Sequence, residues 1–337
     1  MREGAVRTQR RRRRRPRRPL RVAALDLGTN NCRLLIATPK HGGDLHIIDS
    51  FSRIVRLGEG VAETGELSPA AIERTIAALK ICAEHMRAKG VDRVRAITTE
   101  ACRRASNTSL LLARARNEAG IELSVITTEE EARLAAMGCA PLIGPKAEGG
   151  LIFDIGGGST EVIWMRRDSN GVPRVIASQS EPVGVVALAD LWKERRSDRA
   201  GYAAMRAAMI DRFRPIRTGM DEVGAFDATT HHLLGTSGTV TTLAGIALGL
   251  ARYDRARVDA SWHRSADIVA VVDRVAGLDL AGRAALGCVG ADRADLILPG
   301  CAIFAAILEH WPCTELRVAD RGLREAILRE LLAERAP

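Results

Sequence analysis

The sequence predicts an α/β protein made of two similar lobes with a cleft between them. Strand-like segments alternate with helix-like segments along most of the chain, which is the pattern of sheets layered with helices. The stretch AALDLGTNNCRL at 23–34 returns in plan as LIFDIGGGSTEV at 151–162, an apolar strand, a polar glycine turn and a second strand. The length of 337 residues also fits about two domains of roughly 100–200 residues each.

The first half of the chain alternates strands and helices. Residues 21–38 form a strand, a turn and a strand, and 45–58 continue with short β-like segments. Apolar residues then recur at helical spacing over 68–90, where Ser68 is the expected N-cap and Gly90 the expected stop. After this helix we expect a strand at 94–99, a helix over 101–120, a strand at 122–128 and a helix from 129 to 139.

The second half repeats this order. It opens with strand, turn and strand at 149–165 and a β-like segment at 173–184, and helices follow over 188–213. Residues 232–249 predict a strand, a glycine turn and a helix, and helical sequence dominates from there to the end. The two halves thus share the order of their elements rather than their amino-acid sequence. We expect the lobes to span residues 22–135 and 136–337.

Residues 1–21 have a composition of their own. They hold eleven arginines and one acid, Glu3, whereas the whole chain carries a net charge of +9, so the remainder is close to neutral. The run Arg10–Arg18 repels itself and buries no apolar area, so we expect a disordered basic arm. It could make a weak contact with RNA or another polyanion. The alternatives are a passive solvated tail, or a start codon assigned too early, with Val22 opening the fold.

Composition excludes several classes of protein. No apolar run approaches the roughly 20 residues of a membrane span, so no membrane partner is expected. The seven cysteines form no C-x-x-C pair, which speaks against a zinc site and against a disulfide framework and favours a reducing, cytoplasmic location. Aromatic residues make up only 3%, which leaves few surfaces for stacking single-stranded nucleic acid.

The glycine turns predict phosphate binding. A turn rich in glycine gathers several backbone N–H groups in one concavity without side chains in the way. Asp154, at the end of its strand, can hold a divalent cation such as Mg²⁺ that bridges carboxylate and phosphate. A dinucleotide-binding loop would open into a helix, whereas here a second strand follows, and a Walker A loop would have a lysine after Gly158.

Seven motifs in order identify a family. The segments ALDLGTNNCRLLI, VRLGEG, TTEACRRASN, EEEARLAAMG, FDIGGGSTEV, LGTSGTVTTLAG and DRADLILPG resemble the exopolyphosphatase / guanosine pentaphosphate phosphohydrolase (Ppx/GppA) family, over about residues 22–330. That family belongs to the superfamily of actin, Hsp70 and sugar kinases. The resemblance implies a fold of two actin-like (ribonuclease H-like) lobes and a homodimer. It also implies Mg²⁺-dependent hydrolysis of a terminal phosphoanhydride in polyphosphate or pppGpp, and with it a role in the stringent response.

The resemblance also implies roles for particular residues. Glu131 matches the glutamate that activates the attacking water, and Arg103 matches an arginine that contacts phosphate. Asp26, Asp154 and Glu161 match acids linked to the metal. The phosphate-binding turns would consist of Gly28, Thr29 and Asn30; Gly156, Gly157, Gly158, Ser159 and Thr160; and Gly238 and Thr239.

Each of these roles has an alternative. Thr128 and Glu131 have the T-x-x-E spacing of a capping box, so Glu131 could only cap its helix. Arg103 could only pair with Glu100 on an exposed helix face. Glu161 could be an outward strand residue, and Ser159 could be a turn former.

The whole protein has alternatives as well. It could be a sensor that binds polyphosphate, an alarmone or RNA without catalysis, or an ATPase or kinase of the same superfamily. Longer members of the family carry a further helical domain after the GLRE motif, and this chain ends soon after that motif. We therefore expect less processivity on long polyphosphate and relatively more activity on short chains or a guanosine nucleotide.

Overall fold

The computed structural model describes residues 18–40, 44–194 and 198–334, so the expected basic arm lies outside the described residues except for its last four. Of these four, Arg18 pairs with Asp92 at 2.6 Å, and Arg21 donates to the carbonyl of Lys89. Residues 18–21 thus lie against the first lobe.

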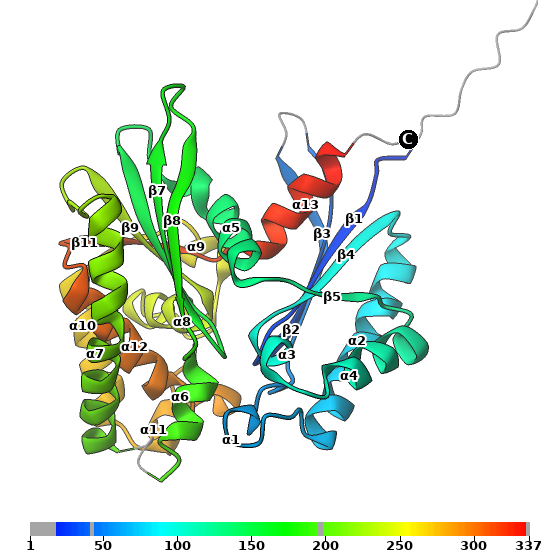
Figure 1. Cartoon of the computed structure of the whole chain (residues 1–337), viewed down its shortest axis with the longest axis horizontal. Coiled ribbons are helices and arrows are strands. Elements are labelled where there is room, and N and C mark those ends of the chain that lie inside the picture. The colour runs from blue at the N-terminus through cyan, green and yellow to red at the C-terminus, as the bar shows by residue number, and fades with distance from the viewer. Residues whose placement is uncertain (1–17, 41–43, 195–197, 335–337) are drawn as a thin grey trace, which may run out of the picture.

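Two sheets of matching topology form the two lobes (Figure 1). In each, three antiparallel strands are followed by two strands parallel to the first of them, and the second sheet has one more short strand, antiparallel, at its edge. The predicted duplication is therefore present in the strand connections. The first sheet has the order β3 (Leu45–Ile54), β2 (Asn31–Pro39), β1 (Val22–Leu27), β4 (Arg93–Thr98) and β5 (Leu123–Val125). The second has the order β10 (Trp262–Arg264), β11 (Glu315–Ala319), β9 (His231–Thr236), β6 (Gly149–Ile155), β7 (Thr160–Arg167) and β8 (Pro173–Glu181).

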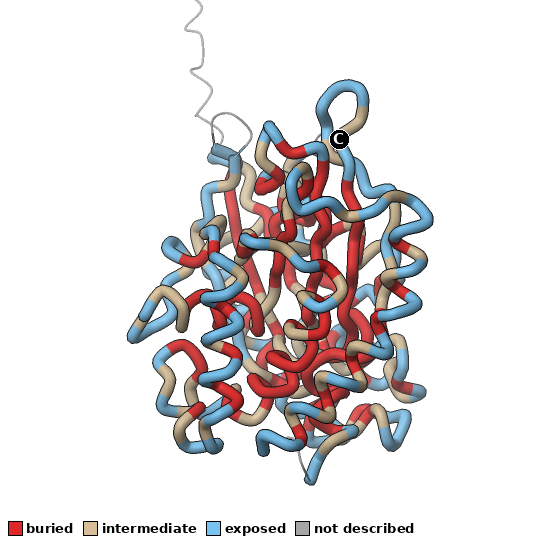
Figure 2. The backbone as a smooth tube through the Cα atoms, turned by 90° about the vertical axis from the view of Figure 1, so that its left-hand side faces the viewer, coloured by how far each residue is buried: buried red, intermediate tan, exposed pale blue. Residues whose placement is uncertain are grey.

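Helices cover both faces of both sheets, and the buried residues concentrate along the strands between them (Figure 2). Successive residues of a strand point to opposite faces, so Ala23 and Leu25 join one core of the first lobe and Val22 and Ala24 another. The helices of the chain up to residue 142 are α1 (Val61–Thr64), α2 (Pro69–Lys89), α3 (Glu100–Arg104), α4 (Thr108–Arg114), a π-helical turn (Ala115–Ala119), α5 (Thr128–Cys139) and a 3₁₀ turn (Ala140–Leu142). Later in the chain come α6 (Val185–Leu191), α7 (Arg199–Val223), α8 (Ser237–Ala247), α9 (Arg255–Val258), α10 (Ser265–Gly277), α11 (Leu280–Ala284), a 3₁₀ turn (Ala291–Arg293), α12 (Ile297–His310) and α13 (Leu323–Ala333).

The caps predicted for the helix at 68–90 are present. The Ser68 side chain accepts a hydrogen bond from the backbone N–H of Ala71, and Pro69 occupies the first turn. Gly90 ends α2 in the left-handed conformation, at φ 59°.

Two parts of the secondary structure differ from the sequence-based prediction. The single helix expected over 101–120 is broken into α3, α4 and the π-helical turn, because Ala105 is extended and the Asn107 side chain bonds both backbone polar groups of Leu67. Strands β10 and β11 were expected to be helical. They are short, and pairing with β9 rather than local propensity makes β11 a strand.

The C-terminal helix α13 returns to the first lobe. Ala326, Ile327 and Leu328 are fully or almost fully buried against β1, β2 and β4. Helix α13 also packs on α5, and these two helices lie between the sheets in the middle of the molecule (Figure 1). The last helix that the structure describes therefore belongs to the hydrophobic core of the first lobe.

The two lobes also touch at the end where α1 meets α6 (Figure 1). Arg56 makes a two-pronged ion pair with Asp295, with N–O distances of 2.8 and 2.9 Å. Lys193 pairs with Glu63 at 2.7 Å. These ion pairs connect the two lobes at this end of the molecule.

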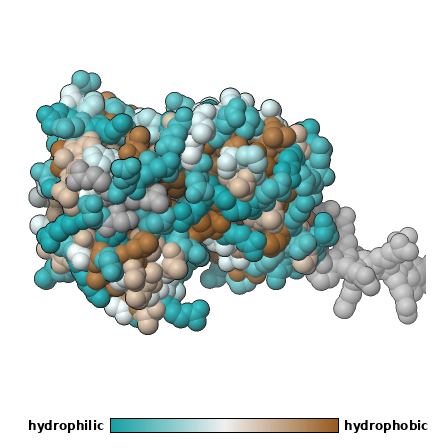
Figure 3. Space-filling model, turned by 90° about the horizontal axis from the view of Figure 1, so that it is seen from below, coloured by the Kyte–Doolittle hydropathy of each residue, from teal (hydrophilic) through white to brown (hydrophobic). Residues whose placement is uncertain are grey.

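No helix among the described residues is long and apolar enough to cross a membrane. The face seen in Figure 3 is largely hydrophilic, and its apolar residues lie in separate patches.

Candidate active site

The three glycine turns of the sequence meet in one cavity between the lobes. The first turn joins β1 to β2, the second joins β6 to β7, and the third joins β9 to α8. All three start at the carboxyl end of a strand, and residues of all three turns line the same cavity. The predicted site residues that line the cavity are Asp26, Gly28, Thr29, Asn30, Glu131, Asp154, Gly156, Gly157, Gly158, Ser159, Glu161, Gly238 and Thr239.

The first two turns pack directly on each other, and this contact requires glycine. A Cβ atom at Gly158 would lie 2.5 Å from Thr29 Oγ1 and 2.9 Å from a side-chain carbon of Glu100. One at Gly157 would lie 3.0 Å from the backbone nitrogen of Asn30. Any side chain here would push the lobes apart, so the glycines permit closure as well as approach of a ligand.

The first turn contains buried oxygens without a partner. Thr29 Oγ1, Asn30 Oδ1 and Asn31 Oδ1 are buried and have no hydrogen-bond partner among the described residues. Buried polar atoms are almost always satisfied, so three consecutive exceptions on a cavity wall indicate a bound polar ligand. A threonine hydroxyl and an amide, which can also present its NH₂ group, suit phosphate oxygens.

Glu131 and Arg103 form a buried ion pair at the edge of this cavity. Arg103 Nη1 lies 2.8 Å from Glu131 Oε2, and the two side chains are 16% and 13% exposed. Arg103 also bonds Glu100, at 2.8 Å, and the carbonyl of Ile126. The expected ion pair between Arg103 and Glu100 is therefore present, but it is buried and lies next to Glu131 rather than on an exposed helix face. Burial raises the pKa of Glu131 to about 7, against the lowering effect of Arg103 beside it.

Glu131 does not cap its helix. The N-cap of α5 is Thr127, whose side chain accepts from the backbone N–H of Glu130. The expected capping box from Thr128 to Glu131 is therefore wrong by one residue. Glu130, in the place that the box would give to its glutamate, pairs with Arg95 and Arg133 instead. Glu131 is left to face the cavity.

Two acids lie side by side in the second lobe. Asp154 and Glu161 are directly opposite each other across the β6–β7 hairpin, so their side chains share a face. Both are buried, at 8% and 2% exposure, and the pKa of each is raised, chiefly by burial. The Ser180 hydroxyl donates to Glu161 at 2.9 Å. Glu161 is therefore an inward residue and not an outward one.

The third turn holds Asp154 through an unusual backbone. Ser237 has φ 74°, a left-handed conformation that favours glycine, and its Oγ donates to Asp154 Oδ1. A strained residue that bonds a buried acid is typical of functional sites.

The acids fit a hard divalent cation. Asp26 comes from the first lobe, and burial raises its pKa as it does for Asp154. Among the described residues no group of three or more His, Cys, Asp or Glu side chains is placed to hold a metal ion by itself. A pair of carboxylates that needs phosphate oxygens and water to complete the shell is the usual arrangement for Mg²⁺.

Two predicted site residues do not line the cavity. Thr160 is fully buried, and its hydroxyl donates to the carbonyl of Val183 at 2.8 Å. Its contribution is thus to fix the second turn. Arg103 stands behind Glu131 and reaches the site through that residue.

The sequence reading missed three arginines that do line it: Arg33, Arg293 and Arg324. Their guanidinium groups make no hydrogen bond or ion pair with the rest of the chain that the structure describes. Arg33 could have been found, because the hairpin places it opposite Asp26, as Glu161 lies opposite Asp154. Arg293 and Arg324 lie in the motifs DRADLILPG and GLRE, but neither was predicted to be a site residue, and it is the tertiary fold that brings them to the cavity.

Comparisons with known proteins agree with this geometry. The model of the Ppx/GppA phosphatase family matches residues 35–335. Exopolyphosphatase 2 of Mycobacterium tuberculosis is 35% identical over 321 residues, covering 91% of this chain and 97% of that protein. The guanosine-5'-triphosphate,3'-diphosphate pyrophosphatase of Photobacterium profundum is 30% identical over 93% of this chain, which spans 59% of that longer relative. The crystal structure of the Aquifex aeolicus member of the family is 32% identical and superimposes with a TM-score of 0.75, covering 94% of this chain and 99% of that one. The predicted fold, two actin-like lobes around a cleft, is confirmed.

Proposed function

The chain belongs to the Ppx/GppA phosphatase family, and we propose that it removes the terminal phosphate from inorganic polyphosphate, from pppGpp, or from both. Relatives named for each of these activities support both substrates. The cavity itself supports phosphoanhydride chemistry, since it combines glycine turns, unpaired hydroxyl and amide groups, arginines and acids.

One observation carries the proposal: the buried carboxyl group of Glu131 lies on the wall of the cavity that the three glycine turns also line. In the described part of the chain its only ion pair is with Arg103. With a pKa of about 7 it can accept a proton near neutral pH. A pure binding protein has no use for such a base. This favours a hydrolase over the sensor that the sequence left open.

The residues divide the work of an in-line displacement. Glu131 orients a water molecule and takes its proton as the oxygen attacks the terminal phosphorus. The backbone N–H groups of Gly157 and Gly158, with Thr29, hold the equatorial oxygens. Arg103 holds Glu131 in place and adds positive charge next to the reacting phosphoryl group.

Asp26 and Asp154 would hold a divalent cation, with Glu161 in support. Bound Mg²⁺ supplies charge neutralisation of the phosphate oxygens and of the leaving group. The Ser237 hydroxyl orients Asp154 for this role. These assignments rest on the burial and the raised pKa values of the acids.

The setting of the protein is part of the proposal. All seven cysteines are free thiols, which suits a reducing cytoplasm. The homodimer, the contact of the Arg10–Arg18 arm with polyanions or RNA, and the division at 135/136, which falls inside α5, stay predictions.

The test is phosphate release with Mg²⁺ from medium-chain polyphosphate and from pppGpp, measured in parallel for the wild type and Glu131→Ala. We expect release from the wild type and a loss of at least about 100-fold in the variant, the low end for a positioned general base. The faster substrate then names the activity. Binding of both substrates without release would instead establish the sensor, and transfer to an acceptor without free phosphate would establish a kinase.

A further inference from the structure

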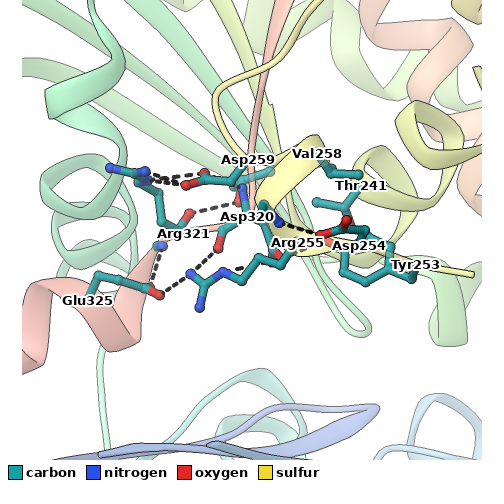
Figure 4. Close-up of polar contacts among 12 residues, drawn as sticks. Thr241, Tyr253, Asp254, Arg255, Val258, Asp259, Asp320, Arg321 and Glu325 are labelled. Carbon is teal, nitrogen blue, oxygen red and sulfur yellow. Dashed lines mark hydrogen bonds and ion pairs between the residues drawn. The ribbon is translucent and has the colours of Figure 1, made fainter. Parts of the chain in front are cut away.

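Two arginines, one on the cavity wall and one behind it, are each held by a carboxylate through the same two nitrogen atoms. In the second lobe Arg321 lines the cavity, and its Nε and Nη2 donate to Asp259 (Figure 4). In the first lobe Arg103 lies behind Glu131, and its Nε and Nη2 donate to Glu100 at 3.1 and 2.8 Å. Two parallel bonds fix the plane of a guanidinium group. Each carboxylate therefore sets the orientation of an arginine at the site.

Contacts with both lobes fix the position of Glu100. It is the first residue of α3 and is only 9% exposed. Its stem packs against the second glycine turn, because a Cβ atom at Gly158 would lie 2.9 Å from Glu100 Cγ and 3.1 Å from Glu100 Cβ. Its charge is paired with Arg103 alone in the part of the chain that the structure describes. Glu100 thus connects the place where the lobes meet to the arginine beside Glu131.

The contact of Arg103 with Glu131 differs in geometry from its contact with Glu100. Arg103 Nη1 lies 2.8 Å from Glu131 Oε2, yet this oxygen is buried and has no hydrogen-bond partner among the described residues. A hydrogen bond needs an N–H that points at the acceptor as well as a short distance. Nη1 donates instead to the carbonyl of Ile126, at 3.0 Å. Arg103 therefore brings positive charge to Glu131 without occupying its oxygen.

The free oxygen of Glu131 suits a general base. A buried oxygen without a donor is costly, which points to a role other than stability. A base needs a lone pair within hydrogen-bond reach of the proton that it takes. A guanidinium group that turned to bind Glu131 through two N–H groups would block that lone pair. Glu100 and Ile126 prevent this turn, because their hydrogen bonds hold Nε, Nη1 and Nη2 of Arg103.

We propose that Glu100 is a positioning residue for catalysis: it holds the Arg103 guanidinium so that Glu131 Oε2 stays free to accept the proton of the attacking water. The proposal rests on the hydrolase function above and deepens it. Glu100 does not line the cavity of the three glycine turns, so it acts through Arg103 and not on the substrate. The pairing of Arg103 with Glu100, which the sequence presented as an alternative to a catalytic role, becomes part of that role.

The experiment measures phosphate release with Mg²⁺ for the wild type, Glu100→Met and Glu100→Gln, on whichever of polyphosphate and pppGpp the wild type hydrolyses faster. Methionine has the length of glutamate but no oxygen, so Arg103 can turn onto Glu131. We expect kcat to fall at least about tenfold and KM to stay within about twofold, because the base is disturbed and substrate binding is not. Glutamine keeps one carbonyl oxygen, and one oxygen accepts both bonds in the wild type, so Glu100→Gln should recover most of the loss.

A double-mutant cycle separates this role from a purely structural one. Since Glu100 acts through Arg103, adding Glu100→Met to Arg103→Gln should change kcat by less than about twofold. Losses that multiply would overturn the proposal, and so would a wild-type kcat in Glu100→Met. The matched control is Glu73→Met, which removes the two-pronged partner of Arg114 in the same lobe, away from the cavity, and should keep the wild-type kcat.

A crystal structure of Glu100→Met gives a readout that does not depend on turnover. We expect the Arg103 guanidinium to turn and donate to Glu131 Oε2 in this variant, and to keep its wild-type position in Glu100→Gln. An Arg103 that does not move in Glu100→Met would overturn the proposal and leave the hydrolase standing. A wild type that releases no phosphate would overturn the hydrolase, and the crystal structure would still show whether Glu100 sets the position of Arg103.

Discussion

Burial gives the Glu131 carboxyl group a pKa that suits its proposed role as a base at neutral pH. Burial raises its pKa from the ordinary 4.5 to about 7, Arg103 beside it lowers the pKa, and Asp154 and Asp26 raise it by smaller amounts. The residue is a base only when deprotonated. We therefore expect kcat to fall as the pH drops below about 7 and to level off above it, as measured by phosphate release between pH 5 and 9.

Replacement of Arg103 by glutamine supplies the control for that profile. Because Arg103 favours the charged form of Glu131, its removal should raise the pKa of Glu131 and move the acidic limb of the profile to higher pH. A rate that is lower at all pH values with an unmoved limb would mean that Arg103 acts on phosphate and not through Glu131.

At the scale of elements, each lobe has a hairpin of the same kind, but the two hairpins carry different charged pairs. Asp26 faces Arg33 across the first hairpin, and Asp154 faces Glu161 across the second. One lobe thus presents an acid with a cation and the other presents two acids. The two hairpins therefore bring different charges to the same cavity.

Helix α13 follows the second lobe in the sequence but packs into the hydrophobic core of the first lobe. Ile327 is fully buried in the core of the first lobe. Replacement of Ile327 by alanine should therefore cost about 2–5 kcal/mol, as for other large-to-small changes in cores. We expect hydrogen exchange to speed up in β1, β2 and β4 more than in β6 and β7.

The control for this prediction is Leu280→Ala, an apolar residue that is 48% exposed on α11. It should leave exchange in both sheets nearly unchanged. Faster exchange in the second sheet alone after Ile327→Ala would show that α13 stabilises its own lobe instead.

At the scale of the whole molecule, ion pairs across the cleft hold the lobes together. Arg56 and Asp295 are 29% and 17% exposed, so their attraction is only partly screened by water. Replacement of Arg56 by glutamine should favour an open form, with a larger radius of gyration by small-angle scattering and a lower kcat/KM, because closure brings the turns of both lobes to one phosphate.

Arg174→Gln is the matched control, since Arg174 pairs with Asp168 within the second lobe, near the tip of the β7–β8 hairpin. It should change neither the radius of gyration nor the rate. An unchanged radius of gyration for Arg56→Gln would mean that contacts of the glycine turns alone keep the cleft closed.

The parts of the fold that were predicted from sequence are those with strong local signals. Helix α2 carries its own caps at Ser68 and Gly90, and the hairpins around Asp26 and Asp154 have an alternating apolar pattern with glycine between the strands. The break after α3 and the strand β11 could not be predicted in this way. Asn107 bonds a loop 40 residues away, and β11 owes its form to β9.

The sequence by itself determined that the chain has two matching lobes with a glycine turn at the end of corresponding strands, because glycine and strand patterns act over a few positions. Its motifs, through the family resemblance, also pointed to Glu131 and Asp154 as candidate site residues. Only the tertiary structure decided that Glu131 is a buried carboxyl group on the cavity wall and not a helix cap, that Thr160 does not line the cavity, and that Arg293 and Arg324 do. Burial and the approach of residues hundreds of positions apart depend on how the two sheets and α13 pack, and no short pattern in the chain records that.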